Sequence, residues 1–256
     1  MLPEQRRREI LSLLAESGGV DVPRLAERLD VSPATVRRDL ALLEDLGQLE
    51  RTHGGAVTSG TGTAFEPRYD EKRMRATAEK QAIARAAVEL VADGAVVVLD
   101  SGSTTFALAR ELKRRRGLTA ITVDLKIAIE LAEVPGFDVI VVGGRVRPEL
   151  FGVVGPMTQE ALSELHADVA FLGADAISLA AGVTNASLDE VAIKRAIVAA
   201  ARTSYVLADA SKFGQVSLAK VADVRRFAGI VTDAGLDRAT VQSFTDAGVR
   251  LTLAQP

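Results

Sequence analysis

A short polar loop follows an apolar run at residues 99–112, which read LDSGSTTFALAREL. The loop, Ser101 to Thr105, lies between a predicted strand that ends at Asp100 and a predicted helix. A turn of small residues before a helix presents N–H and hydroxyl donors, and a helix N-terminus favours anions. Such a turn suits a phosphate group. The loop is a weak signal alone, because the same residues serve as an ordinary helix cap.

Polar residues recur where the other predicted strands end. The carboxyl ends of parallel strands meet at one edge of an open α/β sheet, and ligands bind there. The residues that we expect at this edge are Asp100, Gly102, Ser103, Thr104, Thr105, Asp124, Arg147, Asp175, Glu190, Lys194, Asp209 and Lys212. Helix amides and cations would hold a phosphate, and carboxylates would accept from sugar hydroxyls. The sequence therefore predicts a phosphorylated sugar as the class of ligand.

The same edge leaves a second function open. Acids and a lysine of this kind also transfer protons on sugar phosphates, so an isomerase-like enzyme is an alternative, and a protein with both functions is a third. Glu190 and Lys194, four residues apart on a helix, are often only a surface ion pair. No Walker loop or GxGxxG pattern follows a strand, which argues against a nucleotide site.

Alternating helices and strands position these residues from residue 79 onward. The predicted strands are apolar runs at 95–100, 119–124, 137–144, 167–175, 203–209, 227–233 and 249–254. The predicted helices cover 78–94, 103–114, 125–134, 156–165, 187–201 and 236–248. Continuous apolar strands between helices predict an α/β, Rossmann-like fold with a mostly parallel sheet covered on both faces.

The first 57 residues have a different pattern. Three helical segments are followed by a hairpin at 48–57, which predicts a winged helix-turn-helix. The third helix has Ser32 as its N-cap, an apolar stripe of Val36, Leu40 and Leu43, and its end at Gly47.

The outer face of this third helix could read DNA. Thr35, Arg37 and Arg38 project outward near its N-terminal half, the part that meets base edges in the major groove. Ser32 could contact a phosphate, and Arg51 and His53 on the hairpin could reach the backbone or minor groove. Acids outnumber bases in residues 1–57, so DNA affinity must come from local clustering of the cations.

Composition limits the remaining possibilities. The chain has no cysteine and only two histidines, so we expect no metal site and no cofactor. No signal segment and no apolar run of roughly 20 residues is present, which favours a cytoplasmic protein without membrane contact. Ser, Thr, Gly and mixed charge at 58–78 predict a linker, flexible at first and helical toward its end, between a DNA-binding domain at 1–57 and a ligand domain at 79–256.

Both parts resemble one family. The segment SPATVRRDLALLEDLGQLERTHGGA is similar to the winged helix-turn-helix of DeoR-family bacterial transcriptional regulators. The segments LDSGSTTFALAREL, GVTNASLDEVAIKRAIVAAAR and VLADASKFG resemble the sensor domain of that family. The resemblance implies a sensor similar in fold to ribose-5-phosphate isomerase and CoA transferases. It implies a repressor of carbohydrate catabolism rather than an enzyme, which a phosphorylated sugar releases from double-stranded operator DNA.

The resemblance also implies residue roles. Asp100 with Gly102 to Thr105 would form the phosphate-and-sugar loop, and the rest of the pocket would be lined by Asp175, Glu190, Lys194, Asp209 and Lys212. Thr122-Val123-Asp124 stands where many members have Thr-Asn-Ser, so the resemblance leaves the identity of the effector open. A helix-turn-helix binds paired half-sites about one helical turn apart, so we expect a homo-oligomer.

Overall fold

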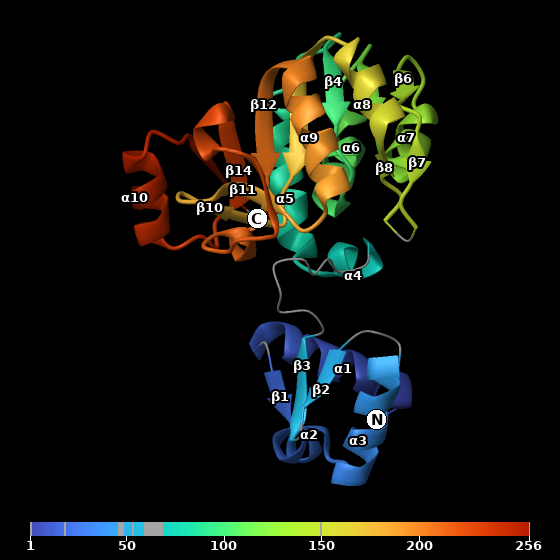
Figure 1. The fold of residues 1–256 in the computed structure, drawn as a ribbon, viewed down its shortest axis with the longest axis vertical. Helices are drawn as coiled ribbons and strands as arrows, with labels where there is room; N and C mark the ends of the chain where they lie inside the picture. Colours follow the sequence, from blue (N-terminus) through green and yellow to red (C-terminus); the bar gives the residue numbers. More distant parts are fainter. Residues whose placement is uncertain are drawn as a thin grey trace. The chain divides into compact units, whose positions relative to one another are not determined.

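The computed structural model describes residues 2–17, 19–45, 49–52, 54–58, 69–148 and 150–255. The chain divides into two compact units, Met1–Phe65 and Glu66–Pro256, both drawn in Figure 1. Gly47 and His53, which the sequence assigned to a helix end and to DNA binding, lie outside the described residues. No helix in the described part of the chain is long and apolar enough to cross a membrane.

The first unit contains three helices and a small antiparallel sheet. Its helices are α1 (Pro3–Ser17), α2 (Val22–Leu29) and α3 (Pro33–Asp45). Its strands are β1 (Gly19–Asp21), β2 (Leu49–Thr52) and β3 (Gly55–Thr58), in the order β1-β3-β2. Three helices and the β2–β3 hairpin confirm the predicted winged helix-turn-helix. The sequence did not predict β1. The carbonyl oxygen of Val20 in β1 would lie 1.9 Å from a Cβ at position 55, so only glycine fits at that position.

The apolar stripe of α3 faces the core as predicted. Val36, Leu40 and Leu43 are buried together with Ile10 of α1 and Leu25 of α2. This periodicity fixes the rotation of α3, and it leaves the opposite side of the helix in contact with solvent.

A buried acid on α3 also fixes this helix. Asp39 is only 4% exposed and accepts a 2.5 Å hydrogen bond from Nε of Arg6 on α1. Arg7 lies 3.7 Å from the other carboxylate oxygen. The hydrogen bond with Asp39 raises the pKa of Arg6. This ion pair, which the sequence did not predict, joins α1 to α3.

The second unit is built on a seven-stranded parallel sheet. Its strands, in spatial order, are β15 (Leu251–Ala254), β14 (Gly229–Asp233), β12 (Ala201–Leu207), β9 (Ala167–Gly173), β4 (Val96–Leu99), β5 (Thr119–Thr122) and β6 (Asp138–Val141). The seven predicted strands and their parallel pairing are therefore confirmed.

Helices cover both faces of this sheet, as Figure 1 shows. The helices are α5 (Thr77–Val88), α6 (Ser103–Leu112), α7 (Leu125–Ala132), α8 (Pro156–Ser163), α9 (Leu188–Ala200) and α10 (Arg238–Asp246). Val97 and Leu99 of β4 pack with α5, α6 and α7, whereas Val98 packs with α8 and α9. Alternate residues of each buried strand thus supply two separate hydrophobic clusters.

The second unit also contains several shorter elements outside the large sheet. A second, antiparallel sheet has the order β10 (Ala176–Ser178), β11 (Gly182–Asn185) and β13 (Ala219–Ala222). A hairpin joins β7 (Arg145–Val146) to β8 (Val153–Val154), and two short 3₁₀ turns cover Ala210–Lys212 and Val224–Arg226. The sequence pattern predicted none of these elements.

The end of the predicted linker is helical, as the sequence indicated, and it belongs to the second unit. Residues 69–74 form helix α4 (Tyr69–Met74), and the unit boundary falls before Glu66. Tyr69 is buried, so this segment packs on the second unit instead of connecting the units as a flexible chain.

The packing of α3 gives a stability prediction. Leu40→Asp would place a charge in the core of the first unit, so it should lower the free energy of unfolding of that unit by about 3–5 kcal/mol. Leu42→Asp is the matched control, because Leu42 lies on the same helix and is 41% exposed. Calorimetry of the full chain should show the loss only for Leu40→Asp, and equal melting of both variants would refute the rotation of α3.

Candidate functional site

The outer face of α3 carries the predicted DNA-reading residues. Arg37 and Arg38 are exposed and form no ion pair with the described residues. Ser32 caps the helix, since its Oγ accepts from the amide of Thr35 at 3.1 Å and lies 2.9 Å from the Thr35 hydroxyl. Arg51 on β2 is exposed and lies 3.6 Å from a carboxylate oxygen of Glu44. The two arginines of α3 are therefore the cations of this set that are available to another molecule.

The strand order of the large sheet defines the second site. The chain runs from β4 outward to β5 and β6, then returns to β9 on the other side of β4 and continues outward to β15. The order therefore reverses between β4 and β9. In open α/β sheets, ligands bind at the carboxyl ends of the strands at such a reversal, the topological switch point.

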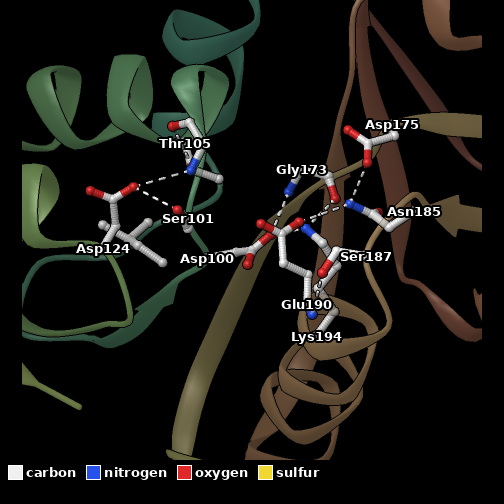
Figure 2. Close-up of polar contacts among 12 residues, drawn as sticks. Asp100, Ser101, Thr105, Asp124, Gly173, Asp175, Asn185, Ser187, Glu190 and Lys194 are labelled. Atoms are coloured by element: carbon white, nitrogen blue, oxygen red, sulfur yellow. Dashed lines mark hydrogen bonds and ion pairs between the residues drawn. The ribbon is translucent and has the colours of Figure 1, made fainter. Parts of the chain in front are cut away.

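A buried ion pair occupies the switch point. Lys194 of α9 donates to Oδ2 of Asp100, which follows β4, and to the carbonyl of Gly173, the last residue of β9, at 2.9 Å. Gly173 donates its amide to the same carboxylate oxygen at 3.0 Å. Burial opposes the charged form of Lys194, but Asp100 and then Glu190 outweigh it and raise its pKa. Lys194 therefore stays charged, and the pair joins β4, β9 and α9, at the centre of Figure 2.

The polar loop begins at this pair. Ser101 donates its hydroxyl to Oδ2 of Asp124 at 2.8 Å, and the Gly102 amide donates to the same oxygen at 3.3 Å. Thr105 ties the first turn of α6 to the Gly102 carbonyl at 2.9 Å, and Ser103 and Thr104 are largely buried in that turn.

Asp124 also caps the next helix. Its Oδ1 accepts from the amides of Lys126 and Ile127 at the start of α7. Asp124 is fully buried, and this burial raises its pKa in spite of these bonds. Both carboxylate oxygens are used within the protein, so Asp124 positions the loop.

Asp175 lies on the other side of the ion pair. Its Oδ2 accepts from Nδ2 of Asn185 at 2.9 Å and from the Ala186 amide at 3.0 Å, and its Oδ1 lies 3.1 Å from the ammonium of Lys72. Burial opposes ionisation of Asp175, but Lys72 and the Ala186 amide outweigh it and lower its pKa. The carboxylate is therefore charged at neutral pH.

Glu190 and Arg147 complete this side. Asn185 lies 3.3 Å from Oε2 of Glu190, and Arg147, beside the β7–β8 hairpin, forms an ion pair with Oε1. Both charged side chains are less than one-fifth exposed.

Three more charged residues lie near this edge. Asp209, after β12, is buried and accepts from the amide and hydroxyl of Ser211. Asp209 and Lys212 both act electrostatically on Lys80 of α5. Burial is the main cause that lowers the pKa of Lys80 to about 8.

The sequence analysis missed three residues of this edge. They are Lys72, Lys80 and Asn185. Ser101 was expected as the first residue of the polar loop, although not as a ligand. Lys72 and Lys80 lie in and beside a charged segment that was interpreted as a linker, and Asn185 ends a strand that was not predicted.

Two cavities lie elsewhere in the second unit. One of about 270 Å³ borders the start of β12, and one of about 390 Å³ borders α9 and β13. Arg226 lines both, and neither contains any residue predicted to bind the ligand. At the predicted edge, by contrast, many of the polar side chains hydrogen-bond to one another or to nearby backbone.

Comparisons with known proteins agree with this organisation. The DeoR-like helix-turn-helix domain matches residues 6–61, and the DeoR C terminal sensor domain matches residues 75–234. The chain is 36% identical to the HTH-type transcriptional regulator GlpR of Haloferax volcanii, over 97% of each chain. It is 31% identical to the glycerol-3-phosphate regulon repressor of Escherichia coli, over 99% of this chain and 100% of that one.

A more distant likeness exists among solved structures. A D-ribose-5-phosphate isomerase in complex with phospho-erythronic acid is 18% identical, with a TM-score of 0.40 over 52% of each chain. That likeness is too remote to bear on function. The two domain matches and the full-length relatives lead to one conclusion: this chain belongs to the DeoR family of transcriptional regulators.

Proposed function

We propose that this protein represses carbohydrate catabolism genes and leaves its operator when a phosphorylated sugar binds the sensor unit. The observation that carries the proposal is the polar loop at the switch point, with carboxylates on one side and lysines nearby. This combination suits a phosphate together with a polyol. The relative named as a glycerol-3-phosphate regulon repressor supports the same class of effector.

The residues of this edge divide into binding and supporting groups. The amides of residues 103–105 and the hydroxyls of Ser103 and Thr104 hold the phosphate, and Lys80 and Lys212 add positive charge. Asp175 and Glu190 accept from the sugar hydroxyls. The supporting residues, which keep these groups in position through their own buried hydrogen bonds, are Asp100, Asp124, Asn185 and Lys194.

Sensing fits these contacts better than catalysis. The enzyme alternative needs an acid or lysine that is free to move a proton on the sugar. Asp100 and Lys194 form a buried ion pair with each other. Both carboxylate oxygens of Asp124 already accept hydrogen bonds from backbone amides and the Ser101 hydroxyl. We therefore propose a sensor without enzymatic activity or cofactor. Turnover of any sugar phosphate by the purified chain would refute this.

The repression mechanism is linkage between two binding events. The effector weakens operator binding only by its differential affinity for two states of the protein. The DNA-bound form is a homo-oligomer, because each α3 reads one half-site of a paired operator in the major groove.

Arg38 gives the first test of DNA reading. If Arg38 contacts a base, Arg38→Ala should weaken operator binding by ~1–3 kcal/mol and relax the preference at one base pair. The measurement is fluorescence anisotropy at fixed salt on DNA from upstream of the gene. Arg202→Ala, an exposed arginine of the sensor unit, is the control. Unchanged affinity in Arg38→Ala would remove this residue from the reading set.

Lys212 tests the effector site. Lys212→Ala should leave operator binding intact and lower effector affinity by about 10- to 100-fold, because a charge-assisted bond to phosphate is lost. Lys220→Ala, at an exposed lysine on β13, should change neither quantity. Calorimetric titration of the full chain measures the affinity. Normal induction in Lys212→Ala would contradict the assignment of the phosphate subsite.

Lys80 makes effector binding depend on pH. Its pKa of about 8 keeps the ammonium charged at pH 7, and the charge is lost as the pH rises above 8. A bound phosphate dianion favours the charged form, so binding takes up a proton above pH 8. Effector affinity should therefore fall about tenfold between pH 7 and pH 9.5. Lys80→Arg stays protonated over this range and should remove the fall. Parallel falls in both proteins would exclude Lys80.

A further inference from the structure

Helix α4 makes polar contacts with the proposed effector site. The ammonium of Lys72, in the middle of α4, lies 3.1 Å from Oδ1 of Asp175. The carbonyl of Lys72 accepts from the hydroxyl of Ser103 at 3.3 Å and also from the ammonium of Lys80. Lys80 donates a second bond, of 2.7 Å, to the carbonyl of Arg75 just after the helix. Figure 1 shows α4 at the end of the unit where α5 begins.

The partners of α4 are the groups that the effector needs. Ser103 belongs to the proposed phosphate loop, Lys80 supplies positive charge for the phosphate, and Asp175 accepts a sugar hydroxyl. These groups have few bonding positions left over. Oδ2 of Asp175 is already occupied by Asn185 and Ala186, so Oδ1, where Lys72 lies, is the oxygen at which a hydroxyl would bind.

One contact of α4 does not involve the proposed site. Tyr69, at the start of the helix, packs edge-to-face on Phe151 with ring centroids 5.9 Å apart. The ammonium of Lys126 lies 3.7 Å from the centre of the Tyr69 ring. This aromatic contact anchors one end of α4, whereas Lys72, in the middle of the helix, is held by groups of the site.

We propose that α4 is an internal competitor of the effector, with Lys72 as the residue that the effector displaces from Asp175. This inference rests on the proposed function and deepens it. Residues 59–68 link the helix-turn-helix unit directly to α4 in the chain. Displacement of α4 therefore transmits effector binding to the DNA-binding unit, and docked α4 corresponds to the state that binds the operator.

The competition predicts an unusual set of effects for Lys72→Met in the full chain. Loss of the ammonium releases α4 without effector, so operator affinity should fall about fivefold. The effector no longer has a competitor, so its affinity should stay equal or increase. The ratio of operator affinities without and with effector should approach one, because the differential affinity for the two states is lost.

The experiment combines three measurements on each protein. Calorimetry measures binding of glycerol 3-phosphate, ribose 5-phosphate and glucose 6-phosphate, anisotropy measures the operator response to the one that binds, and hydrogen exchange measures protection of the amides at 70–75. Arg73→Met, which removes an exposed charge from the same helix, should behave as wild type. Lys72→Arg keeps the charge and should retain most of the response. Thermal unfolding checks that every variant is folded.

The possible outcomes distinguish failure of the competition by α4 from failure of the proposed function. Faster exchange at 70–75 in Lys72→Met, with effector binding kept and the response lost, supports the competition. Unchanged exchange with a full response overturns it, and so does weakened effector binding with normal exchange, which would make Lys72 an effector ligand. If the wild-type protein binds none of the three sugar phosphates, the proposed function fails and the competition fails with it.

Discussion

The buried ion pair between Asp100 and Lys194 is the interaction on which the sensor unit depends. Burying two charges is costly unless they are paired and further hydrogen-bonded, and Gly173 supplies both an amide and a carbonyl. The pair thereby fixes the ends of β4 and β9 to α9 at the point where the strand order reverses. The polar loop starts next to Asp100, and Glu190 lies one helical turn before Lys194. The polar loop and Glu190, both proposed to bind the effector, thus lie next to this charged contact.

The sequence predicted the helices and strands better than it predicted which of them lie side by side. Apolar runs between helices predict a parallel sheet, and residues at strand ends predict a polar edge, both of which need only local patterns. Strand order depends on long-range pairing, so the switch point between β4 and β9 could not be predicted. The contact between Asp100 and Lys194 spans 94 residues and has no local signal. Lys72 was missed because a segment of dense mixed charge is typical of a solvated linker.

In the helix-turn-helix unit, too, local sequence patterns predict the buried face of a helix but not its contacts with residues far away in the chain. The spacing of Val36, Leu40 and Leu43 correctly predicts which face of α3 is buried. Asp39 lies between them in the sequence and has the residue type of an exposed position. Its burial depends on Arg6, 33 residues away, which no periodicity reveals. The ion pair that joins α1 to α3 is therefore a contact that only the folded structure identifies.

In the proposed mechanism, α4 and the effector use the same polar groups, and this shared use connects sensing to DNA release. A crystal structure of the full chain with a bound sugar phosphate tests this connection most directly. The account predicts phosphate on the amides of residues 103–105, a sugar hydroxyl on Oδ1 of Asp175, and the Lys72 ammonium moved away from that oxygen. A ligand bound elsewhere, or a ligand at this edge with Lys72 still hydrogen-bonded to Asp175, would contradict it.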